Sequence, residues 1–339
     1  MSQKKIIVIL TQTIDPHVEP IAEVLRRHDA QMVRFDLQDF PTNIQLAAKI
    51  APEYSWQGSL LYDGQNIALE DIQSVWCRRP KQYQASSESY TPPERAFLNL
   101  ENYRGFLGVL QDMSLLGIGP FWVSRRDKIQ AAEFKLAQLR AAQALGLRIP
   151  RTLITNEPGA VRDFYEECQG QIIVKAVAKG VLDPDGQYMA GQERFIFTNP
   201  VDLEDLEDLT GVSACAHLFQ ERIAKVMDLR VVVIGRQIFT IGIHAHSTQV
   251  ALDWRRSYGD LSYSVETLPD EIEQKLLQFV RLFGLQYSSM DLILSQKGDY
   301  VWLEANPNGQ FLWMASPTDL PMAEAMANLL YRPEEYGLW

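Results

Sequence analysis

The sequence has few features that would place the protein in a membrane, outside the cell or on nucleic acid. No apolar run in its 339 residues approaches the roughly 20 residues that a membrane-spanning helix needs. The first residues, MSQKKIIVILTQT, contain no small-residue cleavage site, so we expect a first strand there and not a signal peptide. The net charge of −11 argues against a general nucleic-acid binder, because phosphate backbones are held by basic surfaces.

Cysteine is scarce and its spacing carries no metal or disulfide pattern. The three cysteines, Cys77, Cys168 and Cys215, are far apart, odd in number and form no CxxC pair. This usage fits a reducing cytoplasm and argues against a disulfide framework, so we expect a cytoplasmic protein whose cysteines are small buried hydrophobes.

Two common ligand motifs are also missing. No GxGxxG follows the first strand, which argues against a dinucleotide site. His244 and His246 are two apart and would share one face of a strand, but no third nitrogen or sulfur ligand is nearby. We therefore expect polar-face histidines or substrate contacts there, and not a zinc pair.

Strand and helix patterns alternate along the chain, which predicts a mixed α/β (α+β) class in three parts, 1–120, 121–215 and 216–339. The composition, 46% hydrophobic and 22% charged, is that of a globular protein. The first part reads as strands KKIIVIL, QMVRFDL and SVWCRRP, helices over 16–28 and 92–113, and a hairpin at Asp63-Gly64. The middle part reads as a helical stretch over 131–150, strands RTLIT and QIIVKAV, a helix VRDFYEEC, a mobile loop over 178–192 and an acidic surface helix over 201–209. The third reads as a strand HLFQERI, a hairpin turning at Gly235-Arg236, a helix over 271–285 ended by Gly284, and a last hairpin.

The last hairpin is the most informative segment. SSMDLILSQKGDYVWLEANPNGQFLW contains two apolar strands joined by a polar turn, and pairing of Ser295 with Tyr300 would place Asp291 opposite Glu304. Glu304 and Asn306 are two apart on an extended chain, so they share a face. Three oxygen donors without Cys or His suit Mg²⁺ carried with phosphates, which predicts a magnesium-nucleotide site rather than an ordinary polar hairpin rim.

Several cationic residues could meet such a nucleotide. Lys175 lies in an apolar strand, where a buried ammonium needs an anion such as phosphate, although its head could also reach solvent. Lys135, on a helix, matters only through its position relative to Lys175. Arg230 begins an apolar VVVI run, where a buried guanidinium needs an anion or a carboxylate as partner. The alternative is an exposed ion pair between Arg230 and Asp228.

Three further segments leave alternatives open. Gln220-Glu221-Arg222-Ile223 alternates along a strand that could offer backbone groups to an adenine edge. The cluster at Asp253-Trp254-Arg255-Arg256 could hold a substrate carboxylate or be a solvated loop. Arg78-Arg79-Pro80 could form an inter-domain contact, a ligand contact or a plain surface end.

The order of these features resembles the ATP-grasp superfamily over residues ~120–320: a helix lysine, a strand lysine, a QE strand, a DLR strand and a D…E.N hairpin. Over most of the chain the segments VWCRRP, KLAQLRAAQALGLRIPRTLITN, IIVKA, FQERIAKVMDLRVVVIG, DWR and LEANPNGQFLW are similar to the ATP-grasp maturases of graspetides, the microviridin-type peptide cyclases. The resemblance implies an ATP-grasp fold preceded by an N-terminal pre-ATP-grasp α/β domain.

The resemblance also implies roles for individual residues. Lys135 and Lys175 would contact nucleotide phosphates, with Lys175 also near the adenine. Arg230 would steady the transferred phosphate and the acyl phosphate, and with Lys175 it would be catalytic. The other implied roles are an adenine pocket of Gln220, Glu221 and Ile223, magnesium ligands Asp291, Glu304 and Asn306, with Glu304 between two ions, and peptide contacts from Asp253 and Arg255. A leader peptide would dock near 187–209.

One departure concerns the phosphate lid, since the loop after Lys175 holds only the widely spaced Gly180, Gly186 and Gly191 in place of a glycine-rich run. The implied activity is ATP-dependent, ADP-forming ligation: Asp or Glu side chains of a ribosomal precursor peptide, leader plus core, become acyl phosphates and cyclise onto Thr, Ser or Lys. The rivals are an amino-acid ligase of the same fold, a phosphotransferase and a non-catalytic nucleotide-binding scaffold. The sequence leaves open the ester or amide bond, the number of rings and a homodimer.

Overall fold

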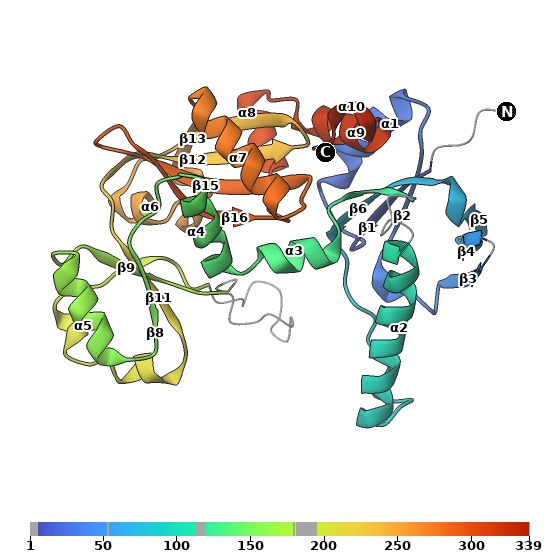
Figure 1. The fold of residues 1–339 in the computed structure, drawn as a ribbon, viewed down its shortest axis with the longest axis horizontal. Coiled ribbons are helices and arrows are strands. Elements are labelled where there is room, and N and C mark those ends of the chain that lie inside the picture. The colour runs from blue at the N-terminus through green and yellow to red at the C-terminus, as the bar shows by residue number, and fades with distance from the viewer. Residues whose placement is uncertain (1–5, 53, 113–118, 179, 181–194, 339) are drawn as a thin grey trace.

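The computed structural model describes residues 6–52, 54–112, 119–178, 180 and 195–338, and Figure 1 shows their arrangement. Helices and sheets are mixed as predicted, with one parallel sheet and three antiparallel sheets in chain order. No helix in the described ranges is long and apolar enough to cross a membrane.

The first sheet is parallel, in the order β2-β1-β6-β7. Its strands are β1 (Ile6–Thr11), β2 (Gln31–Phe35), β6 (Ile72–Arg79) and β7 (Phe121–Val123). All of β1 is buried, which is expected for a central parallel strand covered on both faces. Between β1 and β2 the chain crosses through α1 (Val18–Arg27), whose buried positions are the five apolar residues that fix its inward face: Val18, Ile21, Ala22, Val24 and Leu25.

A small antiparallel sheet, β3 (Ile44–Ala51), β4 (Tyr54–Tyr62) and β5 (Gln65–Ala68), is attached to this unit. The predicted turn is confirmed: Asp63 and Gly64 both have positive φ, 48° and 70°, the conformation that a two-residue hairpin turn requires. β3 and β7 were not predicted. The long helix α2 (Pro92–Asp112) projects away from the body (Figure 1).

The middle sheet is antiparallel, in the order β10-β9-β11-β8. It contains β8 (Thr152–Thr155), β9 (Ile172–Lys175), β10 (Asn199–Pro200) and β11 (His217–Glu221), covered by α5 (Pro158–Glu167). It has its own small core of eight buried residues: Val161, Phe164, Cys168, Ile172, Val201, Leu209, Val212 and Phe219.

Two predictions for the middle part need correction. The helical stretch over 131–150 is broken at Glu133-Phe134 into α3 (Arg126–Ala132) and α4 (Lys135–Ala144). The predicted acidic helix over 201–209 is wrong, because only the 3₁₀ turns Glu204–Leu206 and Thr210–Ala214 form. Glu204 and Asp205 would each face Asp208 on a helix, and such like-charge pairs disfavour a short helix that is already costly to nucleate. The predicted mobile loop lies outside the described residues except for Ala178 and Gly180.

The third sheet is antiparallel, in the order β14-β13-β12-β15-β16. Its strands are β12 (Lys225–Ile234), β13 (Gln237–Ala245), β14 (Leu261–Glu266), β15 (Tyr287–Ser295) and β16 (Tyr300–Asn306). The predicted turn at Gly235-Arg236 is confirmed, and so is the helix α7 (Asp270–Leu282), which ends before Gly284 at φ +66°. The following elements were not predicted: β14, α6 (Thr248–Leu252), α8 (Ala315–Thr318), α9 (Met322–Tyr331) and α10 (Pro333–Tyr336).

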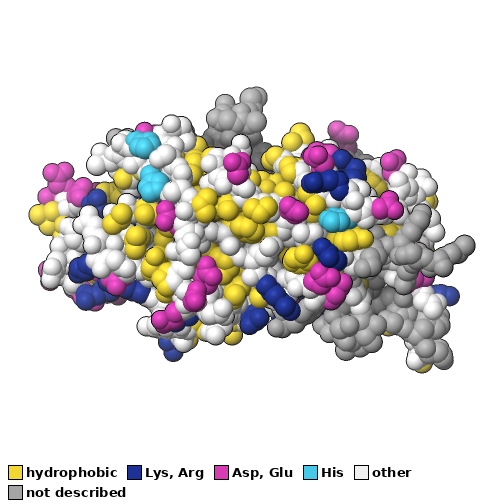
Figure 2. All heavy atoms as spheres, turned by 90° about the horizontal axis from the view of Figure 1, so that it is seen from above, with side chains coloured by type: hydrophobic (Ala, Val, Ile, Leu, Met, Phe, Trp, Pro, Cys, Tyr) yellow, Lys and Arg dark blue, Asp and Glu magenta, His cyan; other side chains and the backbone are white. Residues whose placement is uncertain are grey.

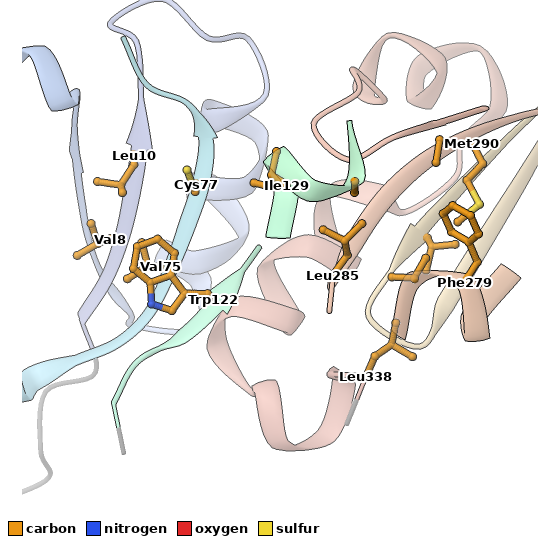
Figure 3. Close-up of a cluster of buried hydrophobic side chains, with 14 of the residues drawn as sticks. Val8, Leu10, Val75, Cys77, Trp122, Ile129, Phe279, Leu285, Met290 and Leu338 are labelled. Carbon is orange, nitrogen blue, oxygen red and sulfur yellow. The ribbon is translucent and has the colours of Figure 1, made fainter. Parts of the chain in front are cut away.

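The first and third sheets are joined by two clusters of buried hydrophobic residues. Figure 3 shows Leu10, Cys77 and Trp122 of the first unit leading through Ile129 to Leu285 of the third, and all belong to one buried cluster. A second shared cluster joins α1 to α9. Cys77 and Cys168 are buried as predicted, whereas Cys215 is exposed. The division at 120 and 215 stays a prediction; β11, which follows residue 215, pairs with the middle sheet.

The face of the molecule seen in Figure 2 mixes both charges. Lys and Arg side chains lie among Asp and Glu side chains, and hydrophobic side chains gather between them. The acidic surplus of the sequence is therefore not separated into one acidic and one basic area on this face.

Candidate functional site

Three neighbouring strands of the third sheet carry charged residues in one row. Arg230 on β12 pairs with Asp291 on β15, and Asp291 pairs with Glu304 on β16. The predicted juxtaposition of Asp291 and Glu304 is confirmed, although the pairing at the turn differs. Tyr300 pairs with Leu294 and not with Ser295, so the register is off by one at the turn end.

A bulge in β16 corrects this difference. Trp302 pairs with Leu292 and Glu304 with Asp291, which leaves Leu303 as an extra residue on β16. Trp302 is fully buried in the core, whereas Leu303 and Glu304, which follow it directly, both line the same cavity. The bulge thus turns two consecutive side chains toward one side of the sheet.

Arg230 holds Asp291 from the side. Its Nη1 donates to both carboxylate oxygens of Asp291, at 2.7 and 2.8 Å, and its Nη2 donates to the Gln310 carbonyl oxygen at 3.4 Å. Asn306 donates from Nδ2 to Asp291 Oδ2 at 3.3 Å. The alternative Arg230–Asp228 pair does not form, because Asp228 binds Lys225 instead, at 2.6 and 2.7 Å.

Glu304 faces two lysines. Lys135, the first residue of α4, lies with its Nζ 3.0 Å from Glu304 Oε2 and donates to the Ala176 carbonyl oxygen at 3.0 Å. Burial by itself would raise the pKa of Glu304, but Lys135 and Lys175 outweigh it and lower this pKa to about 2. In Asp291, burial raises the pKa, and the negative charge of Glu304 adds to this effect against the opposing Arg230. Two crowded carboxylates of this kind favour a bound cation.

Lys175, the last residue of β9, is short of negative charge. Burial lowers its pKa, Lys135 and Arg255 lower it further, and Glu304 only partly compensates. The Lys175 ammonium makes no hydrogen bond or ion pair with the described part of the chain. A polyanion placed between Lys135, Lys175 and Arg255 would restore the balance.

These groups line one cavity of about 470 Å³ between the middle and third sheets. Of the residues singled out from the sequence, it is lined by Lys135, Lys175, Gln220, Glu221, Ile223, Asp253, Arg255, Asp291 and Glu304. Arg230 and Asn306 do not line it but contact Asp291 directly. The size suits a nucleotide-sized ligand.

The segment between β11 and β12 forms one wall of the cavity. The Gln220 side chain is already engaged, since its Nε2 donates to Thr152 Oγ1 at 3.0 Å. The Ile223 N–H, by contrast, makes no backbone hydrogen bond to the described residues. A free amide beside an apolar side chain is what an adenine edge can use. The sequence analysis assigned no role in this wall to Lys225 or Asp228, whose spacing of three gave no recognisable signal.

Asp253 and Arg255 bind each other. Arg255 donates from Nε to Asp253 Oδ1 at 2.8 Å and from Nη2 to Oδ2 at 2.6 Å, and the Thr198 N–H donates to Oδ2 at 2.9 Å. Asp253 is buried, whereas the Arg255 side chain is 44% exposed. Burial would raise the pKa of Asp253, but these hydrogen bonds outweigh it and lower the pKa below its usual range. Asp253 therefore orients Arg255, and both of its carboxylate oxygens accept hydrogen bonds from the protein; a contact of Asp253 with a peptide stays a prediction.

This pairing makes a testable contribution to stability. We expect Asp253→Asn to lower the free energy of unfolding by about 2 kcal/mol at pH 7, the usual cost of losing hydrogen bonds to a charged group. Because the folded-state pKa of Asp253 is depressed, the contribution is present above the unfolded pKa of about 3.9 and is lost as the pH falls below it. Urea unfolding at pH 7 and at acidic pH measures this; an equal difference at both pH values would contradict the assignment.

The proposed magnesium ligands fit a hard cation. No group of three or more His, Cys, Asp or Glu in the described ranges could hold a metal, so a site here depends on the amide oxygen of Asn306 beside Asp291 and Glu304. The Asn306 Oδ1 accepts no hydrogen bond from the residues described. An all-oxygen set of two carboxylates and one amide is the donor chemistry of Mg²⁺.

Two other sequence predictions are settled by the geometry. His244 hydrogen-bonds through Nε2 to Ser264 Oγ at 2.8 Å, consistent with a polar-face histidine. Arg78 is buried at 1% exposure and donates to the Asn308 carbonyl oxygen, so it contacts a segment far away in the sequence and is not a plain surface end.

Comparison with known proteins gives the family. Residues 6–118 match the model of the MvdD pre-ATP grasp domain. Macrocyclase MdnB from Microcystis aeruginosa is 32% identical with a TM-score of 0.76, covering 97% of this chain and 99% of its own. Macrocyclase MdnC from the same organism, solved with precursor peptide MdnA, is 27% identical with a TM-score of 0.80, covering 97% and 100%. The ATP-grasp ligase PsnB, solved with a phosphomimetic variant of its minimal precursor, magnesium and ADP, is 24% identical with a TM-score of 0.76, covering 97% and 98%, and shares the fold.

A more distant curated relative is the glutamate–LysW ligase ArgX of Sulfolobus acidocaldarius. It is 23% identical over 214 residues, which are 62% of this chain and 72% of its own. The match to MdnB over nearly the full length of both chains, together with the pre-ATP-grasp model, decides the family. The chain belongs to the ATP-grasp ligases, in the group of the graspetide-type macrocyclases.

Proposed function

We propose that the protein uses ATP to activate Asp or Glu side chains of a ribosomal precursor peptide and closes them onto Thr, Ser or Lys of the same peptide. The observation that carries this is the joining of the Arg230–Asp291–Glu304 row to Lys135 and Lys175 around one nucleotide-sized cavity. Precursor peptides accompany MdnC and PsnB in their solved structures, which supports a peptide substrate here.

The nucleotide would lie between the two sheets. We place its adenine against Ile223, with Gln220 and Glu221 beside it, and its phosphates between Lys135 and Lys175. Lys175, which lacks a partner within the described ranges and whose pKa is lowered by burial, gains the anion it needs. Asp291, Glu304 and Asn306 would hold magnesium, with two ions proposed, and the metal would neutralise phosphate charge.

Activation and ring closure then follow in two steps. A substrate carboxylate oxygen attacks the γ-phosphorus, the bond to the β-phosphate oxygen breaks, and ADP leaves with an acyl phosphate formed. A hydroxyl or amine attacks the acyl carbon, the bond from that carbon to the phosphate oxygen breaks, phosphate leaves with the electron pair, and the nucleophile loses its proton. Arg230 and Lys175 supply positive charge where negative charge develops, and Arg255, oriented by Asp253, faces the acceptor peptide.

The test uses a short neighbouring reading frame rich in Thr, Ser, Asp and Glu near its end. Its peptide is incubated with the protein, ATP and Mg²⁺, and the intact mass is measured together with ADP and phosphate. We expect the loss of one water for each ring, with one ADP formed for each. A peptide whose mass changes only when free amino acids are added, by a gain of residues, would replace the proposal with an amino-acid ligase, the activity in the name of ArgX. A stable phosphorylated product would indicate a phosphotransferase. Light scattering on the same sample would test the possible homodimer.

A further inference from the structure

The loop that follows Asn306 is held by side chains from other elements along most of its length. Residues 308–312 each have a backbone group bound to a distant side chain. Between the end of β16 at Asn306 and the 3₁₀ turn Leu312–Met314, the segment forms no helix or strand. The bonds are Arg78 Nη1 to the Asn308 carbonyl, Tyr287 Oη to the Gly309 carbonyl at 2.7 Å, Arg230 Nη2 to the Gln310 carbonyl at 3.4 Å, and the Phe311 and Leu312 N–H groups to His17 Nε2 at 3.1 and 3.4 Å.

His17 can accept the Phe311 and Leu312 N–H groups at Nε2 only in one protonation state. Because Nε2 accepts two N–H groups, the ring proton lies on Nδ1, which donates to Asp15 Oδ1 at 3.2 Å. Burial lowers the pKa of His17, with Arg78 adding to the effect and Asp15 opposing it. The ring also packs against Phe311, with centroids 5.0 Å apart. A neutral imidazole is therefore fixed in place with its acceptor toward the loop.

Asp15 and Arg78 complete the arrangement from the ends of two parallel strands. Asp15 follows β1, accepts from Thr11 Oγ1 at 2.7 Å, and lies 3.9 Å from Arg78 Nε at the end of β6. All three side chains, Asp15, His17 and Arg78, are at most 7% exposed. They lie in the N-terminal part of the chain, 230 residues (Arg78) and 294 residues (His17) before the loop residues they bind, and do not line the cavity.

The loop is in turn packed against the reaction centre. A Cβ placed on Gly309 would lie 2.7 Å from Ser289 Cβ, 3.2 Å from Asn306 Cβ and 3.3 Å from Arg230 Nη2. Gly309 therefore has no room for a side chain, and the loop is joined to these residues by the Gly309 N–H bond to the Asn306 carbonyl and the Arg230 bond to the Gln310 carbonyl, so a displaced loop would disturb both. The same two residues contact Asp291.

We propose that Asp15, His17 and Arg78 are positioning residues of the ligase centre: they fix loop 307–312 and thereby the places of Asn306 and Arg230. This gives the N-terminal unit a direct part in the reaction, and it rests on the proposed function only for its effect on turnover.

The test compares two substitutions of His17. His17→Phe keeps a ring against Phe311 but removes the acceptor, whereas His17→Gln supplies an oxygen near the position of Nε2. His28→Phe is the matched control, because His28 ends the same helix α1 and stacks on Tyr331 with ring centroids 5.1 Å apart, away from the loop. Amide hydrogen exchange of the peptide containing Phe311 and Leu312 is measured in the full protein, with kcat and the KM for ATP.

We expect His17→Phe to speed exchange of these amides about 10-fold or more and to lower kcat about 10- to 100-fold with little change in the KM for ATP. His17→Gln should keep the exchange rate and kcat close to those of the unmodified protein, and His28→Phe should change neither the exchange rate nor kcat. Unchanged exchange in His17→Phe, or faster exchange with unchanged kcat, would overturn the proposal. If His17→Phe does not fold, His17→Asn, whose side chain is too short to reach the loop, replaces it under the same criteria. Hydrogen exchange measures whether His17 holds loop 307–312 even if the candidate precursor peptide is not a substrate. Failure of the proposed function can therefore be distinguished from failure of this proposal.

Discussion

Arg230→Ala is expected to lower turnover about 10³-fold while the dissociation constant for ATP changes less than about 3-fold. Arg230 donates twice to Asp291 and is 6% exposed, so its removal leaves a buried carboxylate beside Glu304 without its main partner. It also removes positive charge next to the proposed site of phosphoryl transfer. The proposed ATP contacts of Ile223, Lys135 and Lys175 would remain, since these residues line the cavity from other elements.

Formation of ADP and binding of a fluorescent ATP analogue separate these two effects. Arg236→Ala is the control, because Arg236 lies on the same hairpin at its far end and donates to the Gly337 carbonyl oxygen at 2.8 Å. Full activity of Arg230→Ala would exclude the assigned role. Lost ATP binding in the same variant would instead make Arg230 part of the nucleotide site.

Glu304→Gln is expected to reduce turnover about 10³-fold and to raise the magnesium concentration needed for half-maximal activity about 10- to 100-fold. The substitution keeps the size of the side chain but removes the charge that binds Lys135 and would bind the metal. Turnover measured across a magnesium titration, with and without a chelator, tests both numbers.

Asp299→Asn provides the matched control for Glu304. Asp299 is a carboxylate in the turn of the same hairpin and pairs with Arg148 on the surface, so its loss should leave the magnesium dependence unchanged. If Glu304→Gln and Asp299→Asn required the same magnesium concentration, Glu304 would not be a metal ligand.

Local patterns in the sequence predicted the elements that local physics determines. The helix α1, the turn at Asp63-Gly64 and the juxtaposition of Asp291 with Glu304 all follow from periodicity and turn chemistry, and all are confirmed. The predicted helix over 201–209 is wrong. The segment has helical periodicity, but its like charges and short length oppose a helix. The bulge at Leu303 could not be predicted, because an extra residue in a strand leaves no mark in an apolar run.

The contacts between distant segments could not be predicted from the sequence for a different reason. Arg78 was recognised as a possible inter-domain contact, but its partner, the Asn308 carbonyl, is a backbone group that no side-chain pattern announces. The pairing of Asp253 with Arg255 was open to local reasoning, since the two are two residues apart, yet both had been assigned to the peptide. The spacing i, i+2 predicts such a pair only when the backbone conformation is known.

The separation of the cores determines which parts of the molecule can move. The first and third sheets are joined by common buried clusters, whereas the middle sheet has a core of its own. A rotation of the middle sheet about the chain segments after α4 and after β11 would leave both cores intact, but it would have to break polar contacts such as Thr198 N–H to Asp253 and Arg256 to the Thr198 carbonyl. In such a rotation Lys175 would move with the middle sheet, Asp291 and Glu304 would stay with the third sheet, and Lys135 would lose its bond to the Ala176 carbonyl oxygen. A nucleotide that binds both lysines would thus draw the two bodies together, and product release would require them to part again.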